Sequence, residues 1–505
     1  MRVVTDQTAS PISDSEQTAI RKEKRARILD SGLEAYPADL TRSHALREVR
    51  AGWGQLEAGE ETDEEVTIGG RVVFIRNTGK LCFATLQDGF TPDDNGERLQ
   101  VMLSLAEVGE DALARWKADV DLGDHVWVRG RVICSKRGEL SVMAAQWRMA
   151  SKALRPLPAL HKDLSDESRV RRRYVDLIAR DDARTMVRTR SAITRAVRDT
   201  LYDQGYLEVE TPTLQLIHGG AAARPFQTHL NAFDLDMTLR IALELHLKRT
   251  MVGGADRVFE IGRVFRNEGI DSTHSAEFTM LEAYQSWGDQ RTVARLTQDL
   301  VVAAADAVGS RQIETPAGTI DLDGEWPWLS VFPALSAEVG QELTVHTPVE
   351  VLHGIADARE VEYDAKWAAD KMIMELFGEL VEPTLLQPTF VYDYPAIAQP
   401  LARRHRTDEG KVEAWDLIIG GVERGTGYTE LVDPVIQRDV LMSQSVKAAA
   451  GDHEAMQFDQ DFVEALEHGV PPLGGLGLGM DRLVMLLTGV GIRETILFPL
   501  LRPQG

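Results

Sequence analysis

The sequence predicts a multidomain α+β protein, in which a small all-β domain precedes a larger domain of mixed helices and strands. Two observations support this fold class. The chain has 505 residues, of which 43% are hydrophobic, and this is enough to bury more than one core. In addition, apolar residues alternate with a period of two from residue 66 to about residue 147, whereas long helical patterns mix with strands from about residue 176 onward.

The composition excludes several classes of protein but does not indicate a function. A net charge of -23 excludes a surface that is basic throughout, although a local basic patch can still bind nucleic acid. The sequence shows no signal peptide and no apolar stretch long enough to span a membrane, and its two cysteines, Cys82 and Cys134, lack the spacing of a zinc site. We therefore expect a cytoplasmic protein with no membrane partner.

Residues 1–60 are expected to form a polar tail followed by a helical extension. Residues 1 to about 17 are rich in Ser, Thr, Asp and Pro, which is typical of disorder. From Glu16, the segment EQTAIRKEKRARILDSG predicts a helix with a basic face, ending at Gly32. That face is equally consistent with a solvated surface and with a strip that binds RNA phosphates.

Residues 61–152 predict a small β-barrel. Short alternating strands are separated by Gly and Asp turns, and a helix-like segment, LAEVGEDALARWKADVDLGD, lies between the third and fourth strands. Five strands with a helix at that point is the element order of an OB-fold, which commonly binds single-stranded nucleic acid. Residues 153–175, with prolines and an arginine cluster, predict a hinge before a third part at 176–505 that contains a helical insertion at about 335–395.

The segment RVFEIGRVFRNEGIDSTHSAEFTMLEAYQSW predicts a β-hairpin that carries charged side chains. The segment alternates up to Phe265, continues as a polar loop, and alternates again from Glu277. Buried charges need partners or a ligand, so these residues are expected to line a polar cleft. The alternative is an exposed sheet edge with surface salt bridges. The side chains concerned are Arg266, Glu268, Glu282 and Tyr284.

Two further segments contain candidate binding residues. In PPLGGLGLGMDRLVMLL, glycines alternate along a short strand and would let a flat ligand approach closely, and Arg482 stands where a helix begins. In VEAWDLIIGGVERGTGYTELVDP, Asp416 and Glu423 flank a Gly-Gly bend. Carboxylates near a phosphate site favour Mg²⁺, which prefers oxygen ligands. The alternative is a pair of surface acids in an acidic chain.

Together these segments resemble class II aminoacyl-tRNA synthetases. GYLEVETPTL, FRNEG and GLGLGMDR are similar, in order and spacing, to the three signatures of that class, and the preceding OB-fold is similar to the subclass for aspartate, asparagine and lysine. LRPLP, RYVDLI, GGAAARPFQTH and ELHLKR resemble lysine–tRNA ligases in particular, and the resemblance covers residues from about 16 to 503. It implies a catalytic domain with an antiparallel sheet flanked by helices, which ligates L-lysine to tRNA(Lys) through a lysyl-adenylate.

The resemblance implies an ATP site around two catalytic arginines. Arg266 resembles the clamp between the substrate carboxylate and the α-phosphate, where a bidentate guanidinium stabilises developing charge. Glu268 and His274 resemble loop residues that contact adenine and the phosphates. Phe278 and Arg482 resemble the ring and the guanidinium on the two faces of adenine. The implied Mg²⁺ ligands are Asp416 and Glu423, and Glu423 also belongs to the ATP site.

The implied amino-acid site is acidic. By the resemblance, Glu430 and Tyr284 bind the ε-ammonium of lysine, while Glu244 and the Gly220 carbonyl bind the α-ammonium. Carboxylates suit a substrate with two ammonium groups because they replace its water, whereas an aspartate pocket needs basic residues. The full implied set is Gly220, Glu244, Glu282, Tyr284, Thr426, Tyr428 and Glu430.

The resemblance also implies an anticodon site on the barrel. Phe83, Gln100 and Glu139 are similar to residues that bind the central uridine of the anticodon. An aromatic ring for stacking and polar groups for base edges suit single-stranded RNA.

Five residues depart from the usual pattern of lysine–tRNA ligases. Leu243 stands where a proline precedes the first pocket glutamate, Thr238 where tyrosine is usual, and His246 where an aromatic residue is usual. Thr426 replaces an asparagine that often contacts the carboxylate, and Asp416 is shorter than the usual glutamate. These departures leave open a duplicated or specialised lysyl transferase.

Three other functions fit the sequence less well than the ligase. A translation-factor lysyl-modifying enzyme would lack the barrel, and a lipid lysyltransferase fused to a synthetase would need a region of several membrane spans. A non-catalytic tRNA-binding regulatory paralogue would be favoured by loss of Arg266, Glu268 or Arg482, and all three are present.

Finally, the resemblance implies a homodimer. The helix at residues 190–204 and the strand ending at Pro212 are similar to the first class II signature, which builds a two-fold interface. Ile193, Val197 and Leu201 form an apolar stripe on that helix, and something must cover it. The alternative is that the stripe is covered within its own subunit.

Overall fold

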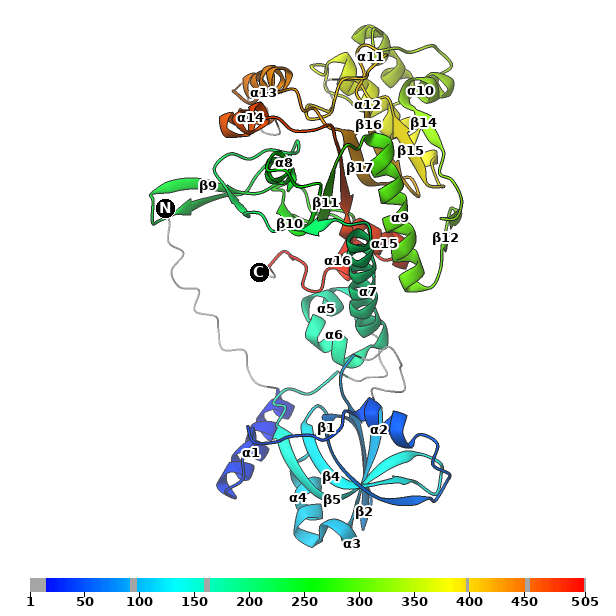
Figure 1. Ribbon diagram of the computed structural model, residues 1–505. Coiled ribbons are helices and arrows are strands. Elements are labelled where there is room, and N and C mark those ends of the chain that lie inside the picture. The colour runs from blue at the N-terminus through cyan, green and yellow to red at the C-terminus, as the bar shows by residue number, and fades with distance from the viewer. Residues whose placement is uncertain (1–14, 91–97, 159–163, 397–398, 450–454, 504–505) are drawn as a thin grey trace. The chain divides into compact units, whose positions relative to one another are not determined.

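The computed structural model describes residues 15–90, 98–158, 164–396, 399–449 and 455–503, and the chain divides into two compact units, residues 1–188 and 189–505 (Figure 1). The α+β class and the order of a β-barrel before a larger sheet are confirmed. The predicted disordered tail at residues 1 to about 17 falls almost entirely outside the described residues. Within the described residues, we find no helix with the length and apolar character that a membrane span requires.

Unit 1 contains a closed five-stranded barrel in the order β1-β2-β3-β5-β4. Neighbouring strands are antiparallel except β3 and β5, which are parallel. The period-two pattern arises because alternate residues such as Ile68, Leu86 and Val101 point into the barrel, where they are fully buried. Cys82 and Cys134 are free and buried, as expected. The strands are β1 Glu61–Asn77, β2 Leu81–Gln87, β3 Arg98–Ser104, β4 His125–Cys134 and β5 Leu140–Ser151.

Short helices accompany the barrel. The helix expected between the third and fourth strands is present as α3 and α4, and Trp116 of α4 is fully buried against the barrel core. The segment expected as a hinge, residues 153–175, contains α5 and the start of α6, whereas the two compact units divide after residue 188. The helices are α1 Glu16–Asp30, α2 Leu46–Trp53, α3 Leu105–Val108, α4 Glu110–Asp119, α5 Asp166–Arg171 and α6 Arg173–Ala179.

The basic residues of α1 are divided between contacts with the barrel and solvent. Arg21 is buried and donates to two backbone carbonyls, at 2.9 and 3.1 Å. Lys24 pairs with Asp121 at 2.7 Å and Arg27 with Asp119 at 2.6 Å. Arg21, Lys24 and Arg27 therefore attach the helix to the barrel, although Arg27 remains 55% exposed and Lys22 is exposed, so part of the basic face is solvated.

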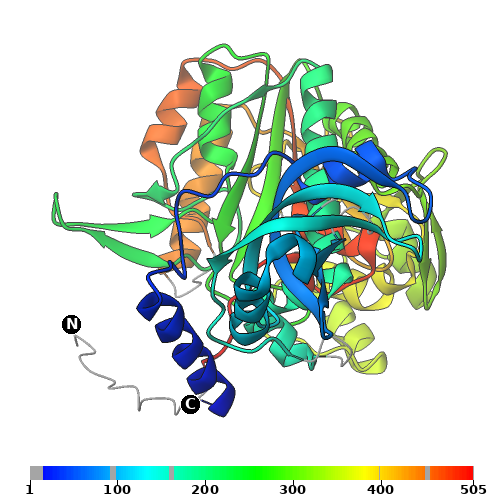
Figure 2. The same cartoon turned by 90° about the horizontal axis from the view of Figure 1, so that it is seen from below.

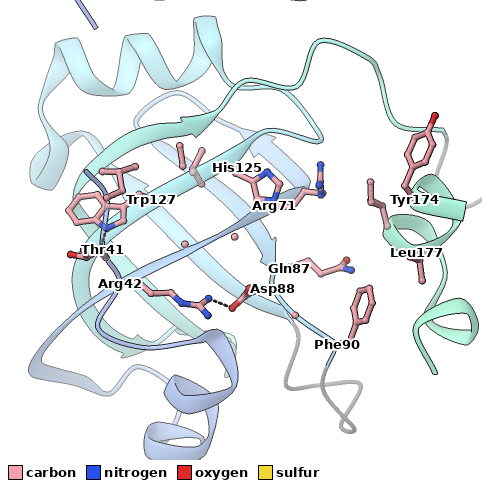
Figure 3. Close-up of a pocket in the computed structure, with 17 residues that line it drawn as sticks. Thr41, Arg42, Arg71, Gln87, Asp88, Phe90, His125, Trp127, Tyr174 and Leu177 are labelled. Carbon is pink, nitrogen blue, oxygen red and sulfur yellow. Dashed lines mark hydrogen bonds and ion pairs between the residues drawn. The ribbon is translucent and has the colours of Figure 1, made fainter. Parts of the chain in front are cut away.

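A hollow of about 590 Å³ lies in unit 1 between one end of the barrel and α6 (Figure 3). In Figure 3, Trp127 lies on one side of the hollow, Tyr174 on the other, and Arg71 and His125 between them. Burial and the nearby Arg71 lower the pKa of His125 to about 4, so its imidazole is neutral at pH 7. None of the predicted site residues lines this hollow.

Unit 2 is built on an eight-stranded sheet in the order β14-β15-β16-β17-β18-β11-β10-β6. Its interior pairs are antiparallel, and only the two outermost pairs, β14–β15 and β10–β6, are parallel. The predicted hairpin is present as β10 and β11. The strands are β6 Leu207–Glu208, β10 Arg257–Phe265, β11 Glu277–Ser286, β14 Trp328–Ser330, β15 Thr389–Tyr392, β16 Ala414–Ile418, β17 Glu423–Thr429 and β18 Leu473–Gly479.

Helices and two small sheets surround this large sheet. The hairpin of β8 and β9 extends away from the body of unit 2 in both views (Figures 1 and 2), and Phe233 near its tip is exposed. The range expected as a helical insertion, about 335–395, contains part of α10, all of α11 and α12, and also strand β15. The elements are β7 Leu214–Gln215, β8 Gln227–Leu230, β9 Leu235–Leu239, β12 Gln312–Thr315 and β13 Gly318–Asp321, with α7 Asp181–Asp203, α8 Glu244–Val252, α9 Gln290–Val308, α10 Val331–Val339, α11 Val349–Ala358, α12 Ala369–Leu380, η1 Glu382–Thr384, α13 Pro434–Ala449, α14 Gln460–Glu467, α15 Met480–Thr488 and α16 Ile492–Thr495.

The apolar stripe on α7 is covered inside the chain. Ile193, Val197 and Leu201 are all fully buried without a second subunit. The argument that this stripe needs a partner is therefore wrong, because the chain's own packing satisfies it. Exposed apolar side chains lie instead on the following segment, where Leu207 is 59% and Leu216 is 63% exposed.

Candidate active site

Strand β18 forms the floor of the site because its glycines and leucines alternate. It lies between β11 and β17, and its leucines are buried in the core. Gly475 and Gly477 line the cavity above the strand. A Cβ atom at Gly475 would lie 2.0 Å from Glu430 Oε1 and 2.5 Å from the Tyr284 ring. At this position the glycine therefore makes room for two side chains of the protein as well as for a ligand.

Two cavities adjoin above this floor and share five lining residues. One has a volume of about 320 Å³ and the other of about 240 Å³. All seven residues predicted for the amino-acid site line the first cavity, and the six predicted for the ATP site line the second. The shared residues are Arg266, Met280, Glu423, Thr426 and Gly477.

Buried carboxylates dominate the first cavity. Glu282, on β11, accepts hydrogen bonds from the Leu243 backbone N–H at 2.8 Å and from the Tyr284 hydroxyl at 3.1 Å. Burial, together with the charge of Glu244, raises the pKa of Glu282 to about 8. The departure at residue 243 thus has a structural consequence, because a proline there would have no N–H to donate to Glu282.

Lys248 is the residue in this region that the sequence analysis did not single out. Its ammonium lies 2.5 Å from Glu244 Oε1 and 2.5 Å from Glu430 Oε2, and its side chain is 1% exposed. Burial raises the pKa of Glu430 to about 8, although Lys248 acts in the opposite direction. The available signal in ELHLKR was the spacing of Glu244 and Lys248, which are four residues apart and would share one face if the segment were helical.

The second cavity brings together the predicted ATP residues. Arg482, in the first turn of α15, donates to the Glu423 carbonyl at 2.9 Å, while its other terminal nitrogen lies 3.3 Å from His274 Nε2. The Arg266 guanidinium lies 5.2 Å from the centre of the Phe278 ring, and burial lowers the Arg266 pKa. Cationic groups and an aromatic face in one cavity suit a nucleotide. Glu268, which is exposed, also lines this cavity and accepts from the Arg224 backbone N–H at 3.3 Å.

Two further residues of the second cavity were missed. Asp481 is buried; one of its oxygens accepts from Arg190 at 2.5 Å and the other from the Thr279 backbone N–H at 2.7 Å, so it links α15 to α7 and β11. Arg424 is buried beside Arg482, and burial lowers its pKa to about 10. Asp481 directly precedes the predicted Arg482, and Arg424 directly follows the predicted Glu423. The local sequence does not distinguish the members of each pair, whereas their packing does.

The predicted metal pair is only partly placed at the cavities. Glu423 lines both cavities, whereas Asp416 lies on β16 and lines neither. Burial and the charge of Glu423 raise the pKa of Asp416 to about 7, and burial and Glu423 also raise the pKa of Glu382. Three carboxyl groups thus lie near one another here, and Arg482 lies 3.9 Å from Glu423. Across the described residues there is no cluster of three or more His, Cys, Asp or Glu that would hold a metal by itself.

The predicted anticodon residues lie on the outer surface of the barrel. Phe83 on β2 and Gln100 on β3 alternate with buried neighbours, so they point outward. The Gln100 amide donates to the Ser141 hydroxyl at 2.8 Å, and that hydroxyl donates to the Glu139 carbonyl at 2.9 Å. Arg76 lies 4.7 Å from the centre of the Phe83 ring. Phe83 is therefore not a core residue.

The remaining departures have local partners. The Thr426 hydroxyl donates to the Trp415 carbonyl at 3.2 Å, and the Thr238 hydroxyl donates to the Gln215 carbonyl at 3.3 Å. His246 Nδ1 lies 3.2 Å from the Arg249 guanidinium, and burial lowers the pKa of His246.

Comparison with known proteins identifies the family. A family described as tRNA synthetases class II (D, K and N) matches residues 165–502, and an OB-fold nucleic acid binding domain matches residues 66–150. A lysine–tRNA ligase of Kineococcus radiotolerans is 56% identical over 492 residues, which is 97% of each chain. Lysine–tRNA ligase 1 of Mycobacterium tuberculosis is 54% identical over 498 residues, 97% of this chain and 98% of that one.

A longer relative also matches. The lysylphosphatidylglycerol biosynthesis bifunctional protein LysX of Rhodococcus opacus is 45% identical over 504 residues, 98% of this chain but 44% of that protein. With both domains matched and high identity along nearly the whole length, the chain belongs to the lysine–tRNA ligases of the class II tRNA synthetases.

Proposed function

We propose that this protein ligates L-lysine to tRNA(Lys) in two steps, through a lysyl-adenylate made from ATP. The observation that carries the proposal is the pair of adjoining cavities, one acidic and one lined by arginines, which share Arg266. In this arrangement a carboxylate bound in the first cavity meets a phosphate bound in the second.

The first cavity suits a substrate with two ammonium groups. Glu244, Glu282 and Glu430 are all at least 95% buried. Glu430 Oε1 accepts no hydrogen bond from a described residue, whereas Oε2 lies 2.5 Å from the Lys248 ammonium. Buried acceptors without donors are costly, and an ε-ammonium would supply the missing donors. Glu430 and Tyr284 therefore bind the ε-ammonium, and Glu244 with the Gly220 carbonyl binds the α-ammonium.

The chemistry requires positioning and electrostatic stabilisation rather than a nucleophilic side chain. The lysine carboxylate attacks the α-phosphorus of ATP, and pyrophosphate leaves. Arg266 bridges the two reacting groups and stabilises the charge that develops between them. Arg482 and Phe278 hold the adenine, with Glu268 and His274 at its edge and at the phosphates. A terminal ribose hydroxyl of the tRNA then attacks the lysyl carbonyl, and AMP leaves.

Mg²⁺ fits the acidic group next to the ATP cavity. Asp416 and Glu423 supply the oxygen ligands that this cation prefers, and burial together with the charge of Glu423 raises the pKa of Asp416. Two carboxylates leave room for phosphate oxygens and water to complete the coordination. When bound, Mg²⁺ would neutralise phosphate charge and assist the departure of pyrophosphate.

The barrel is proposed to bind the anticodon through Phe83, Gln100 and Glu139. Their outward orientation on one surface supports this role, because unpaired bases stack on exposed aromatic rings. We also propose a homodimer, supported by the exposed Leu207 and Leu216, and a cytoplasmic location, where the ligase would meet its tRNA.

ATP–pyrophosphate exchange with each of the twenty amino acids tests the proposed substrate. Lysine should stimulate exchange most, and arginine and ornithine far less. Glu430→Gln should lose about 2–4 kcal/mol of this preference, because a buried charge loses its partner. Strongest exchange with another amino acid would refute lysine as the substrate and leave the class unchanged.

A further inference from the structure

Lys248 occupies a position behind the acidic cavity. It lies on α8, one turn after Glu244, and it does not line the cavity itself. Its ammonium lies 2.5 Å from an oxygen of Glu244 and 2.5 Å from an oxygen of Glu430. Glu430 directly follows β17, so one ammonium links a helix to the end of a central strand.

The second oxygen of each glutamate points toward the cavity. Glu244 Oε2 lies 3.8 Å from the Cβ position of Gly220, and Glu430 Oε1 lies 2.0 Å from that of Gly475. Both glycines line the cavity. Each carboxylate is therefore divided, with one oxygen on Lys248 and the other toward the space where the substrate would bind.

We propose that Lys248 is a positioning residue that sets the preference for lysine, because its ammonium fixes Glu244 and Glu430 so that each presents one oxygen to a different ammonium group of the substrate. The proposal rests on the proposed function, since it assumes that lysine occupies this cavity. Lys248 acts through the two glutamates and does not touch the substrate.

The balance of charge supports this role. The cavity has three buried carboxylates for the substrate's two ammonium groups, namely Glu244, Glu282 and Glu430, while Arg266 is engaged by the substrate carboxylate. Two ammonium groups leave one buried negative charge uncompensated, which is strongly unfavourable. Lys248 supplies the third positive charge from within the protein. With lysine bound, the positive and negative charges of the site balance. With an amino acid whose side chain is uncharged, the site lacks one positive charge.

The groups around Glu430 predict how lysine binding should depend on pH. Lys248 and Glu244 face it from α8, Glu282 and Tyr284 from β11, and Tyr428 from β17. Lys248 is the only cation among these groups, and it lowers the pKa of Glu430 against the effect of burial. Loss of this ammonium would therefore raise that pKa, so that a higher pH is needed to ionise the glutamate for lysine binding.

The test uses the full-length chain with lysine at residue 248 replaced by a neutral side chain. Lys248→Met removes the charge at similar volume, and Lys248→Gln keeps a hydrogen-bond donor, which covers the case in which the methionine variant does not fold. Lys152→Met is the matched control, because Lys152 is equally buried between Asp121 and Asp124, at 2.6 and 2.7 Å, in the barrel. It therefore loses a similar buried ion pair away from the proposed lysine site.

Lysine-dependent ATP–pyrophosphate exchange is measured from pH 6.5 to 9. In the Lys248 variants the KM for lysine should rise about tenfold or more, as expected when a buried pair is broken. The KM for ATP should stay within twofold of wild type. The pH at which the lysine KM falls should rise by about one pH unit. Lys152→Met should lower the melting temperature and leave both KM values and the pH profile unchanged.

The outcomes separate the two proposals. If the wild-type chain shows no lysine-dependent exchange, the proposed function fails. If it does, and a folded Lys248 variant keeps the wild-type lysine KM and pH profile, the role of Lys248 is wrong. A shift of the lysine and ATP KM values by the same factor, matched by Lys152→Met, would also overturn it, because that pattern indicates a general loss of stability.

Discussion

Arg266 lines both cavities, so its removal tests the adenylate step directly. Arg266→Ala should reduce lysine-dependent exchange by about 2.7–4 kcal/mol in transition-state stabilisation, the usual effect of removing one donor to developing charge. The melting temperature should change little, because the nearest hydrogen bond of the Arg266 side chain, to the Ile241 carbonyl, is 3.4 Å long.

A control for this variant lies on the same hairpin. Arg263 is exposed and forms a 3.6 Å pair with Glu277, so Arg263→Ala should keep wild-type exchange. Near-wild-type exchange by a folded Arg266→Ala variant would show that Arg266 is not the clamp.

Single residues also determine how lysine binding depends on pH. Burial raises the pKa values of Glu282 and Glu430 to about 8, so near neutral pH both groups take up protons more readily than an ordinary glutamate. Bound lysine requires them ionised, so binding releases protons and tightens as the pH rises toward 8. Calorimetry in buffers of different ionisation enthalpy should detect this release. Lysine affinity that stays constant from pH 6.5 to 8 would contradict the account.

Among the structural elements, β18 has the most specific requirement for glycine. Gly475→Ala would place a methyl group 2.0 Å from Glu430 Oε1, so the carboxylate must move and lysine affinity should fall by about tenfold or more. At Gly477 the nearest atom to an added Cβ is 3.7 Å away, an ordinary contact. Gly477→Ala is therefore the matched variant on the same strand, and its effect on the lysine KM should be clearly smaller. If Gly475→Ala and Gly477→Ala raise the lysine KM equally, the effect comes from the strand that forms the cavity floor and not from displacement of Glu430.

At the scale of the whole molecule, the exposed apolar side chains of unit 2 predict assembly with a second copy. The exposed Leu207, Leu214 and Leu216 lie at and beyond the edge strand β6, where an apolar surface favours contact with a second copy. We predict an obligate C2 dimer that buries above roughly 2,000 Å² in total. Sedimentation equilibrium at sub-micromolar concentration should give twice the chain mass of 56.0 kDa.

A substitution localises that interface. Leu216→Glu should weaken the dimer because it places a charge in an apolar contact, whereas a substitution of the exposed Phe233 at the tip of the β8–β9 hairpin serves as a surface control. An active wild-type monomer at these concentrations would refute the dimer.

Local patterns in the sequence were enough to predict the elements and the family. The period of two around Phe83, the hairpin between Phe265 and Glu277, and the glycine–leucine alternation of β18 depend on neighbouring residues, and the structure has all three. The resemblance of the motifs placed the predicted residues, and the cavities bring those of the lysine and ATP sites together; their roles remain predictions.

What only the tertiary structure decided is which side chains from distant segments meet. The sequence contains Lys248 and Glu430, but only the packing of α8 against the end of β17 brings them within 2.5 Å. The same holds for the α7 stripe, which the chain covers itself, and for α1, where part of the basic face binds the barrel. Periodicity reports which face of an element is apolar or charged, whereas the partner of that face depends on contacts across the whole chain, which no local pattern contains.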